Sequence, residues 1–136
     1  MTLKRIFQDN TGTIEAIQNL GLTSFKYLYD HESEKENIVL LWFKTDRETW
    51  LRVFINAIYC GIDEYLYDES SSDLKENMTL VEYNRWVDNS TITSAQVTLT
   101  DLQDITLTLE LSNNNSIVYT FDSSEKGSIK FLINDF

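Results

Sequence analysis

The sequence predicts an α+β fold, in which an antiparallel β-sheet packs against two or three helices as a single pair of layers. Three observations lead to this expectation. Apolar and polar residues alternate through the last third of the chain. A continuous apolar run over residues 38–43 is typical of a central strand covered on both faces. Two segments, one starting at Thr45 and one at Thr79, begin with the capping pattern of helices.

The N-terminal third predicts one weak helix and one hairpin. Residues 13–20 place Ile14, Ile17 and Leu20 on one side of a helix, with Gly21 after it. Residues 25–30 alternate in the manner of a half-buried strand. The charged residues that follow are expected to connect this strand to the apolar run in an N-terminal hairpin.

The strongest helix prediction starts at Thr45. Glu48 stands three residues later, which completes a capping box. From Trp50 onward, apolar residues recur at i, i+3, i+4, i+7 and i+8, and Gly61 follows where a helix-ending glycine is expected. A second, short helix is predicted from the capping box of residues 79–82.

The C-terminal third predicts a four-strand antiparallel meander. Its strands are expected around Val97 and over residues 105–111, 117–121 and 129–133, with an asparagine-rich turn at 113–115. One face of this meander is apolar and needs a cover. We expect the helix that contains Trp50 to provide it.

Length and composition predict a single domain over residues 1–136. The hydrophobic fraction is 42%, and the length falls in the usual ~100–150 residue range of one domain. The single cysteine, Cys60, has no partner for an internal disulfide, which favours a reducing compartment. The longest apolar run has six residues, against the ~20 that a membrane helix needs. A cytoplasmic location is therefore expected.

The formal net charge is −11, from 22 acidic and 11 basic side chains. Phosphate backbones and anionic lipid surfaces would repel such a chain, so direct binding to nucleic acid or membranes is not expected. A basic protein partner is favoured. The charge is concentrated in two patches: residues 62–76 hold six acids and one base, a net of −5, and residues 30–37 hold four acids and one base, a net of −3.

The larger patch interleaves carboxylates with tyrosines, which are enriched in the energetically dominant parts of interfaces. Such a surface would suit a basic cleft of a partner. The alternative is a solvated edge strand, with Tyr65 and Tyr67 facing inward and the acids facing water. The predicted partner-binding residues are Asp63, Glu64, Tyr65, Tyr67, Asp68, Glu69, Asp73, Glu32, Glu34 and Glu36.

The sequence contains no recognisable catalytic or cofactor motif, and we expect neither a cofactor nor a metal. The four glycines lack the spacing of a phosphate-binding loop, and the only zinc-type ligands are His31 and Cys60. His31 stands in a charged turn, and Cys60 is expected to be a buried, inert thiol. The 22 acids allow an enzyme that uses paired carboxylates, but they indicate no particular pair.

In size, charge and absence of catalytic motifs, the chain is similar in kind to bacterial toxin-immunity proteins, which bind a cognate toxin such as a nuclease and block it. This similarity of kind implies a binding protein rather than an enzyme, and it assigns no residue. The alternative is a phage-type DNA mimic that inhibits a host restriction, CRISPR or transcription protein. The sequence leaves the partner and the oligomeric state open.

Overall fold

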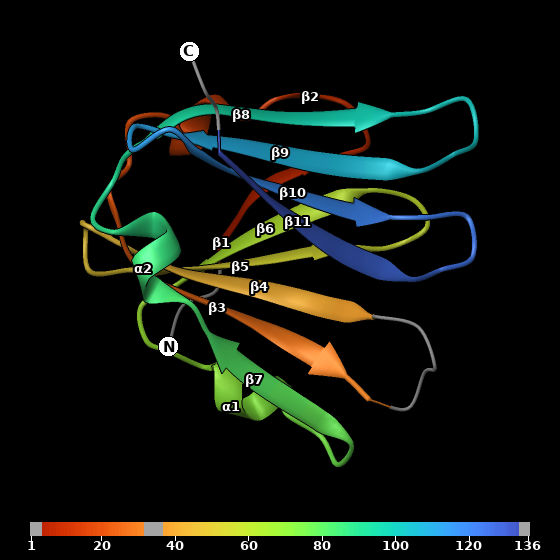
Figure 1. Ribbon diagram of the computed structural model, residues 1–136, viewed down its shortest axis with the longest axis horizontal. Coiled ribbons are helices and arrows are strands. Elements are labelled where there is room, and N and C mark those ends of the chain that lie inside the picture. The colour runs from red at the N-terminus through yellow and green to blue at the C-terminus, as the bar shows by residue number, and fades with distance from the viewer. Residues whose placement is uncertain (1–3, 32–36, 134–136) are drawn as a thin grey trace.

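The computed structural model describes residues 4–31 and 37–133. Of these residues, 58% lie in strands and 9% are helical. The strands form two antiparallel sheets that lie face to face (Figure 1). The larger sheet has the order β1-β6-β5-β4-β3-β7. Its strands are β1 (Lys4–Asp9), β3 (Leu22–Asp30), β4 (Ile38–Thr45), β5 (Trp50–Ile55), β6 (Cys60–Tyr65) and β7 (Met78–Glu82).

The second sheet has five strands in the order β11-β10-β9-β8-β2. They are β2 (Gly12–Thr13), β8 (Ile92–Leu99), β9 (Ile105–Leu111), β10 (Asn115–Phe121) and β11 (Gly127–Ile133). Among the described residues, helical structure is limited to single turns, which are the 3-10 turn η1 (Glu15–Ile17), α1 (Ser70–Asp73) and α2 (Asn84–Val87).

The main core lies between the two sheets and contains side chains from both. Phe25 of β3 stacks on Phe43 of β4, with ring centroids 4.8 Å apart. Tyr119 of β10 is fully buried, and its hydroxyl donates to the Ile38 carbonyl of the opposite sheet at 2.9 Å. Because an unpaired buried hydroxyl is costly, this bond fixes how the two sheets meet. Burial raises the pKa of Tyr119, so the hydroxyl stays a donor.

The predicted α+β class is wrong, because the apolar face of the meander is covered by a second sheet and not by helices. The segment predicted as the main helix, from Thr45 onward, is the end of β4, a turn and β5. The Thr45 side chain accepts from the Arg47 amide at 3.3 Å, and Glu48 has φ +61°. The capping residues therefore close a hairpin, since Ser, Thr and Asp bond to nearby amides in turns as well as in helix caps.

The helical spacing in this segment arose because both faces of β5 are covered. Leu51, Val53 and Ile55 are buried in the main core, while Trp50 and Phe54 pack on the opposite face. Apolar residues at both parities of a strand imitate the i, i+3, i+4 stripe of a helix.

The other two helix predictions are also wrong in extent. The capping box of residues 79–82 lies in β7, and only residues 84–87 after it form the single turn α2. Of the weak candidate at 13–20, only the 3-10 turn η1 is helical.

The strand predictions outside these segments are confirmed. Residues 25–30 lie in β3, residues 38–43 lie in β4, and the two strands pair as an antiparallel hairpin. The C-terminal meander is present as β8-β9-β10-β11, and the turn residue Asn114 has φ +69°. The burial of Cys60 is also confirmed, and loss of solvent raises its pKa to about 12.

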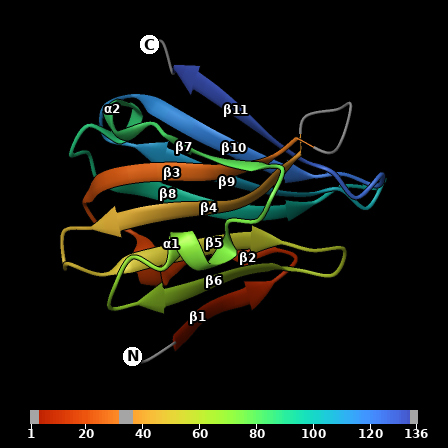
Figure 2. The same cartoon turned by 90° about the horizontal axis from the view of Figure 1, so that it is seen from below.

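One connection determines where the candidate site lies. Strand β7 pairs with β3 at the far edge of the sheet from β6, so the chain between them must pass β5, β4 and β3. Residues 66–77, which we call the crossover segment, lie over the outer face of the sheet, with α1 in front of β4 and β5 (Figure 2). This face points away from the second sheet.

Candidate functional site

A row of side chains crosses the outer face of the six-stranded sheet. The strand register places Lys26 opposite Trp42, Trp42 opposite Arg52, and Arg52 opposite Asp63. Arg5 on β1 stands opposite Asp63 and completes the row. Directly opposed residues of antiparallel strands have Cβ atoms ~4.5–5.5 Å apart, so this register brings Arg52, Asp63 and Arg5 of three neighbouring strands into contact and places Trp42 between Arg52 and Lys26.

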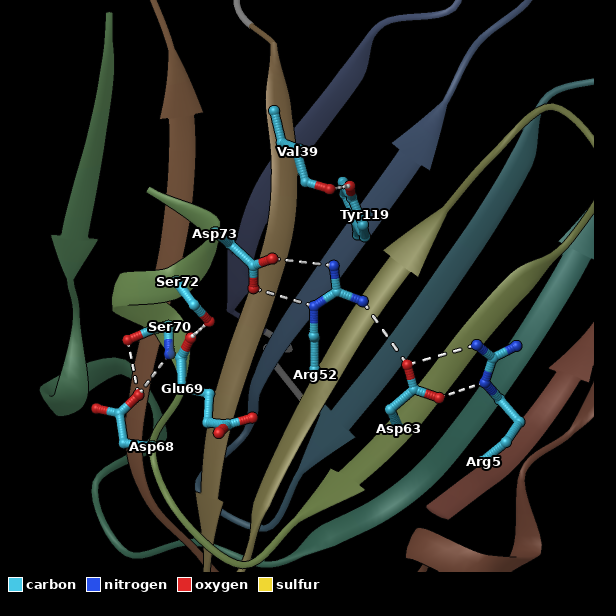
Figure 3. Close-up of polar contacts among 10 residues, drawn as sticks. All are labelled: Arg5, Val39, Arg52, Asp63, Asp68, Glu69, Ser70, Ser72, Asp73 and Tyr119. Atoms are coloured by element: carbon cyan, nitrogen blue, oxygen red, sulfur yellow. Dashed lines mark hydrogen bonds and ion pairs between the residues drawn. The ribbon is translucent and has the colours of Figure 1, made fainter. Parts of the chain in front are cut away.

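Three of these charges, Arg5, Asp63 and Arg52, form a continuous network with Asp73 of the crossover segment (Figure 3). Arg5 donates to Asp63 through Nε, and Arg52 Nη1 lies 3.6 Å from the other Asp63 oxygen. Arg52 also donates from Nε and Nη2 to both oxygens of Asp73, at 3.1 and 3.2 Å. The network holds two cations and two anions and is therefore neutral. The hydrogen bond to Asp63 raises the pKa of Arg5 and outweighs the opposing effect of burial.

Asp63 is the most buried member of this network, with 2% of its surface exposed. A carboxylate at this depth requires charge compensation, because removing one partner of a buried ion pair leaves an uncompensated charge. The two arginines supply it. Asp63 is therefore a structural residue of the sheet, and a partner protein has no access to it.

Aromatic rings fill the space between the charges. The Phe54 ring lies above Gly61, where an added Cβ would come within 2.4 Å of it. Arg5 and Arg52 lie 5.0 and 5.5 Å from the centroid of this ring. Such cation–π contacts contribute ~0.5–1 kcal/mol when exposed and more when desolvated. Tyr65 packs against the buried Trp42 with centroids 5.3 Å apart.

A second ion pair fastens the start of the crossover segment. Asp68 accepts from Lys26 Nζ at 2.5 Å, and from the Ser70 hydroxyl and amide at 2.7 and 3.0 Å. Partial burial alone would raise the pKa of Asp68, but these hydrogen bonds outweigh it and hold that pKa below its ordinary value. Ser72 then donates through Oγ to the Glu69 carbonyl at 2.6 Å. The segment is thus fastened at Asp68 and at Asp73.

The structure brings the predicted residues of the larger patch together, but gives them different environments. Asp63, Asp68 and Asp73 point toward cations of the sheet, as above. Glu64 accepts from Thr49 Oγ1 at 2.9 Å and pairs with Arg47 at 3.3 Å. Tyr67, in contrast, is 67% exposed. The remaining two, Tyr65 and Glu69, are half-buried.

The smaller predicted patch, Glu32, Glu34 and Glu36, lies outside the described residues.

The structure adds residues that the sequence pattern did not indicate. Leu66 and Leu74 of the crossover segment are exposed, as Tyr67 is. The cations Arg5, Lys26 and Arg52 were missed because they lie on strands remote in sequence from the acids that they bind. For Lys26 and Arg52, a signal was the presence of a charge within a mainly apolar strand.

The single histidine of the chain makes one further polar contact. His31 Nε2 lies 2.5 Å from Thr79 Oγ1 on the neighbouring strand, and the imidazole ring packs against Tyr29. Within residues 4–31 and 37–133, no three His, Cys, Asp or Glu side chains are grouped so that they could hold a metal ion. The same residues contain no helix with the length and apolar character needed to cross a bilayer.

No protein-family model, no curated protein and no solved structure matches the chain.

Proposed function

We propose that the protein is a small acidic binding protein that neutralises a basic protein partner in the cytoplasm, in the manner of a toxin-immunity protein. Its activity would be binding and not catalysis. The charge distribution supports this proposal. Among the described residues, ion pairs engage cations mainly on and around the six-stranded sheet, namely Arg5, Lys26, Lys44, Arg47 and Arg52. Since acids outnumber bases by 22 to 11, neutralising these cations internally leaves the acidic excess for the remaining surface.

The single observation that carries the proposal is the exposed apolar surface of the crossover segment. Leu66, Tyr67 and Leu74 are 53%, 67% and 44% exposed, although the segment around them is fastened to the sheet. Tyrosine is enriched in the energetically dominant parts of interfaces, and exposed apolar patches are typical of interaction sites. Because the two ion pairs order the segment in advance, a partner would pay less of the entropic cost of binding.

The predicted residues of the larger patch then include two groups with different roles. Asp63, Asp68 and Asp73 hold the crossover segment in place, whereas Tyr67 and Glu69 are the predicted residues available to contact a partner. Charge reversal at Asp63 would disrupt the sheet and would not test binding. Variants at Tyr67 and Glu69 are therefore the informative ones.

The experiment measures binding of the purified protein to the product of the gene adjacent to its own, by calorimetry at two salt concentrations. We expect tight association that weakens with salt, because surface charges steer and stabilise such complexes. Tyr67→Ala should weaken binding by about 10-fold or more, the range of interface hot spots. Glu69→Lys should weaken it further at low salt.

Glu110→Lys is the matched control, because Glu110 is exposed on β9 of the other sheet and the substitution changes the net charge equally. Wild-type affinity in Tyr67→Ala and Glu69→Lys, or equal losses in the control, would contradict the proposed surface. Adding a DNA duplex separates this proposal from the DNA-mimic alternative, in which DNA competes for the same site on the partner.

A further inference from the structure

Three turns meet at one end of the two sheets and enclose a small pocket. They are the β5–β6 turn (residues 56–59), the β8–β9 turn (100–104) and the β10–β11 turn (122–126), which lie together at the right in Figures 1 and 2. The pocket has a volume of about 230 Å³. Since pockets for drug-sized ligands have volumes of ~300–1,000 Å³, this one has the size for a single side chain.

The turns are held in shape by their own side chains. Asn56 Oδ1 accepts from the amides of Ile58 and Tyr59 at 2.7 and 2.8 Å. Asp104 Oδ1 accepts from the Ser123 amide at 3.0 Å and so joins two of the three turns. A surface fixed in this way binds at a lower entropic cost than a flexible loop would.

The β10–β11 turn is ordered by the same means. Asp122 Oδ1 accepts from the Ser124 amide and hydroxyl at 2.9 and 2.5 Å, and from the Lys126 amide at 3.2 Å. These bonds fix Asp122 and the turn residue Glu125, which has φ +63°. The pocket is therefore present before any partner binds.

The lining of the pocket is partly apolar and partly acidic. Ala57, Leu102 and Phe121 supply apolar surface, and Asp122 and Glu125 supply carboxylates. This combination matches a side chain with a long alkyl stem and a cationic end, because such side chains bury the stem and keep the charge near water or an anion.

The surroundings of the pocket strengthen this match. Ile58 and Leu102 are 71% and 74% exposed, which makes them exposed apolar residues beside the opening. Asp101 and Asp104 lie on the same turn as Leu102. The nearest cation along these turns is Lys126, which follows Glu125 and does not line the pocket.

We propose that this pocket receives one lysine or arginine side chain of the basic protein partner. The inference rests on the proposed function and adds to it a second contact, on a part of the surface away from the crossover segment (Figure 1). The crossover segment would supply the aromatic contact, and the pocket would anchor a cation.

The test is a titration of the ¹⁵N-labelled protein with Nα-acetyl-lysine methylamide, followed by amide chemical shifts. We expect saturable shifts at Gln103, Ser123 and Glu125, with a dissociation constant of about 1 mM or weaker, as suits one side chain. The neutral analogue Nα-acetyl-norleucine methylamide should cause no comparable shifts. Shifts that do not saturate, or that spread equally over other exposed acids, would overturn the proposal.

Two variants and one control locate the site. Leu102→Ser and Glu125→Lys should each weaken lysine-amide binding by about 10-fold or more, whereas Leu132→Ser, an exposed leucine on β11, should leave it unchanged. The same variants are then tested with the adjacent gene product. Normal partner affinity in Glu125→Lys together with loss in Tyr67→Ala would overturn the pocket and leave the proposed function intact. No partner binding in the wild type, with the titration positive, would overturn the proposed function alone.

Discussion

The two faces of the six-stranded sheet are built from the same strands but are buried by different means. The inner face packs side chains such as Phe43 and Val53 against the second sheet. The outer face places Arg52 and Asp63 between aromatic rings, under a segment of irregular chain. Packing needs only complementary shape, whereas charges under a cover must be paired. The comparison shows that acidic residues which look like a surface patch in the sequence can hold a covering segment on a sheet, by pairing with cations of its strands.

The inner face should give the largest loss of stability on truncation. Phe43 is fully buried and stacks on Phe25, so Phe43→Ala removes a large ring and leaves a cavity. We expect a loss of about 3–5 kcal/mol in the free energy of unfolding, measured by urea denaturation. A loss below about 1 kcal/mol would indicate that this face is not close-packed.

The outer face should respond most strongly at Asp63. Asp63→Asn keeps the size of the side chain but leaves Arg5 and Arg52 without their shared counter-charge. Because both arginines are partly exposed and can reach water, we expect a loss of about 2–3 kcal/mol, smaller than for Phe43→Ala. Glu110→Gln, on the exposed part of β9, should change stability by less than about 0.5 kcal/mol under the same conditions.

Gly61 tests the aromatic part of the outer face. Gly61→Ala would place a methyl group 2.4 Å from the Phe54 ring and displace that ring from Arg5 and Arg52, at a cost of about 1–3 kcal/mol. In the Phe54→Ala background the clash is absent, so the two changes should be strongly non-additive. Simple additivity would show that the ring does not occupy this position.

Lowering the pH should loosen the crossover segment, with a smaller loss of stability than the substitutions above. The pKa of Asp68 is lowered by folding from its ordinary value of 3.8, so its contribution to stability is complete above pH 3.8 and is lost as the pH falls through the lowered value. Because the side chain is about one-third exposed, the effect is at most about 1 kcal/mol. Amide shifts of Ser70 and Ser72 should move in this range in the wild type and not in Asp68→Asn. Unchanged shifts in the wild type would contradict the role of Asp68.

The sequence predicts best where one face of a strand meets water. Strand β9 alternates strictly, β10 alternates in part, and the turn before β10 contains Asn114, so period and turn chemistry agree. Neither side of strand β5 faces solvent. Its one charged residue, Arg52, is paired with Asp73 of the crossover segment. Its spacing then fits a helix equally well, and only the neighbouring strands on both sides decide between the two structures.

The sequence indicated the acidic residues of the larger patch but not the residues that they contact. Lys26 and Asp68 are 42 residues apart, and Arg5 and Asp63 are 58 apart. Pairing them requires the strand order and the path of the chain over β3–β5, which a local pattern does not contain. The charge count therefore indicated a patch, and the topology assigned most of its acids to the fold.

The most direct test of whether these acids hold the crossover segment is native-state hydrogen exchange in the double variant Asp68→Asn/Asp73→Asn. The amides of Ser72 and Leu74 are bonded within the crossover segment and report on its opening. We predict that their protection falls about 10-fold, because two partly exposed ion pairs together contribute about 1–2 kcal/mol, while protection in β9 and β10 stays unchanged. Unchanged protection at Ser72 and Leu74, or an equal fall in both sheets, would contradict the conclusion that these acids fasten the crossover segment.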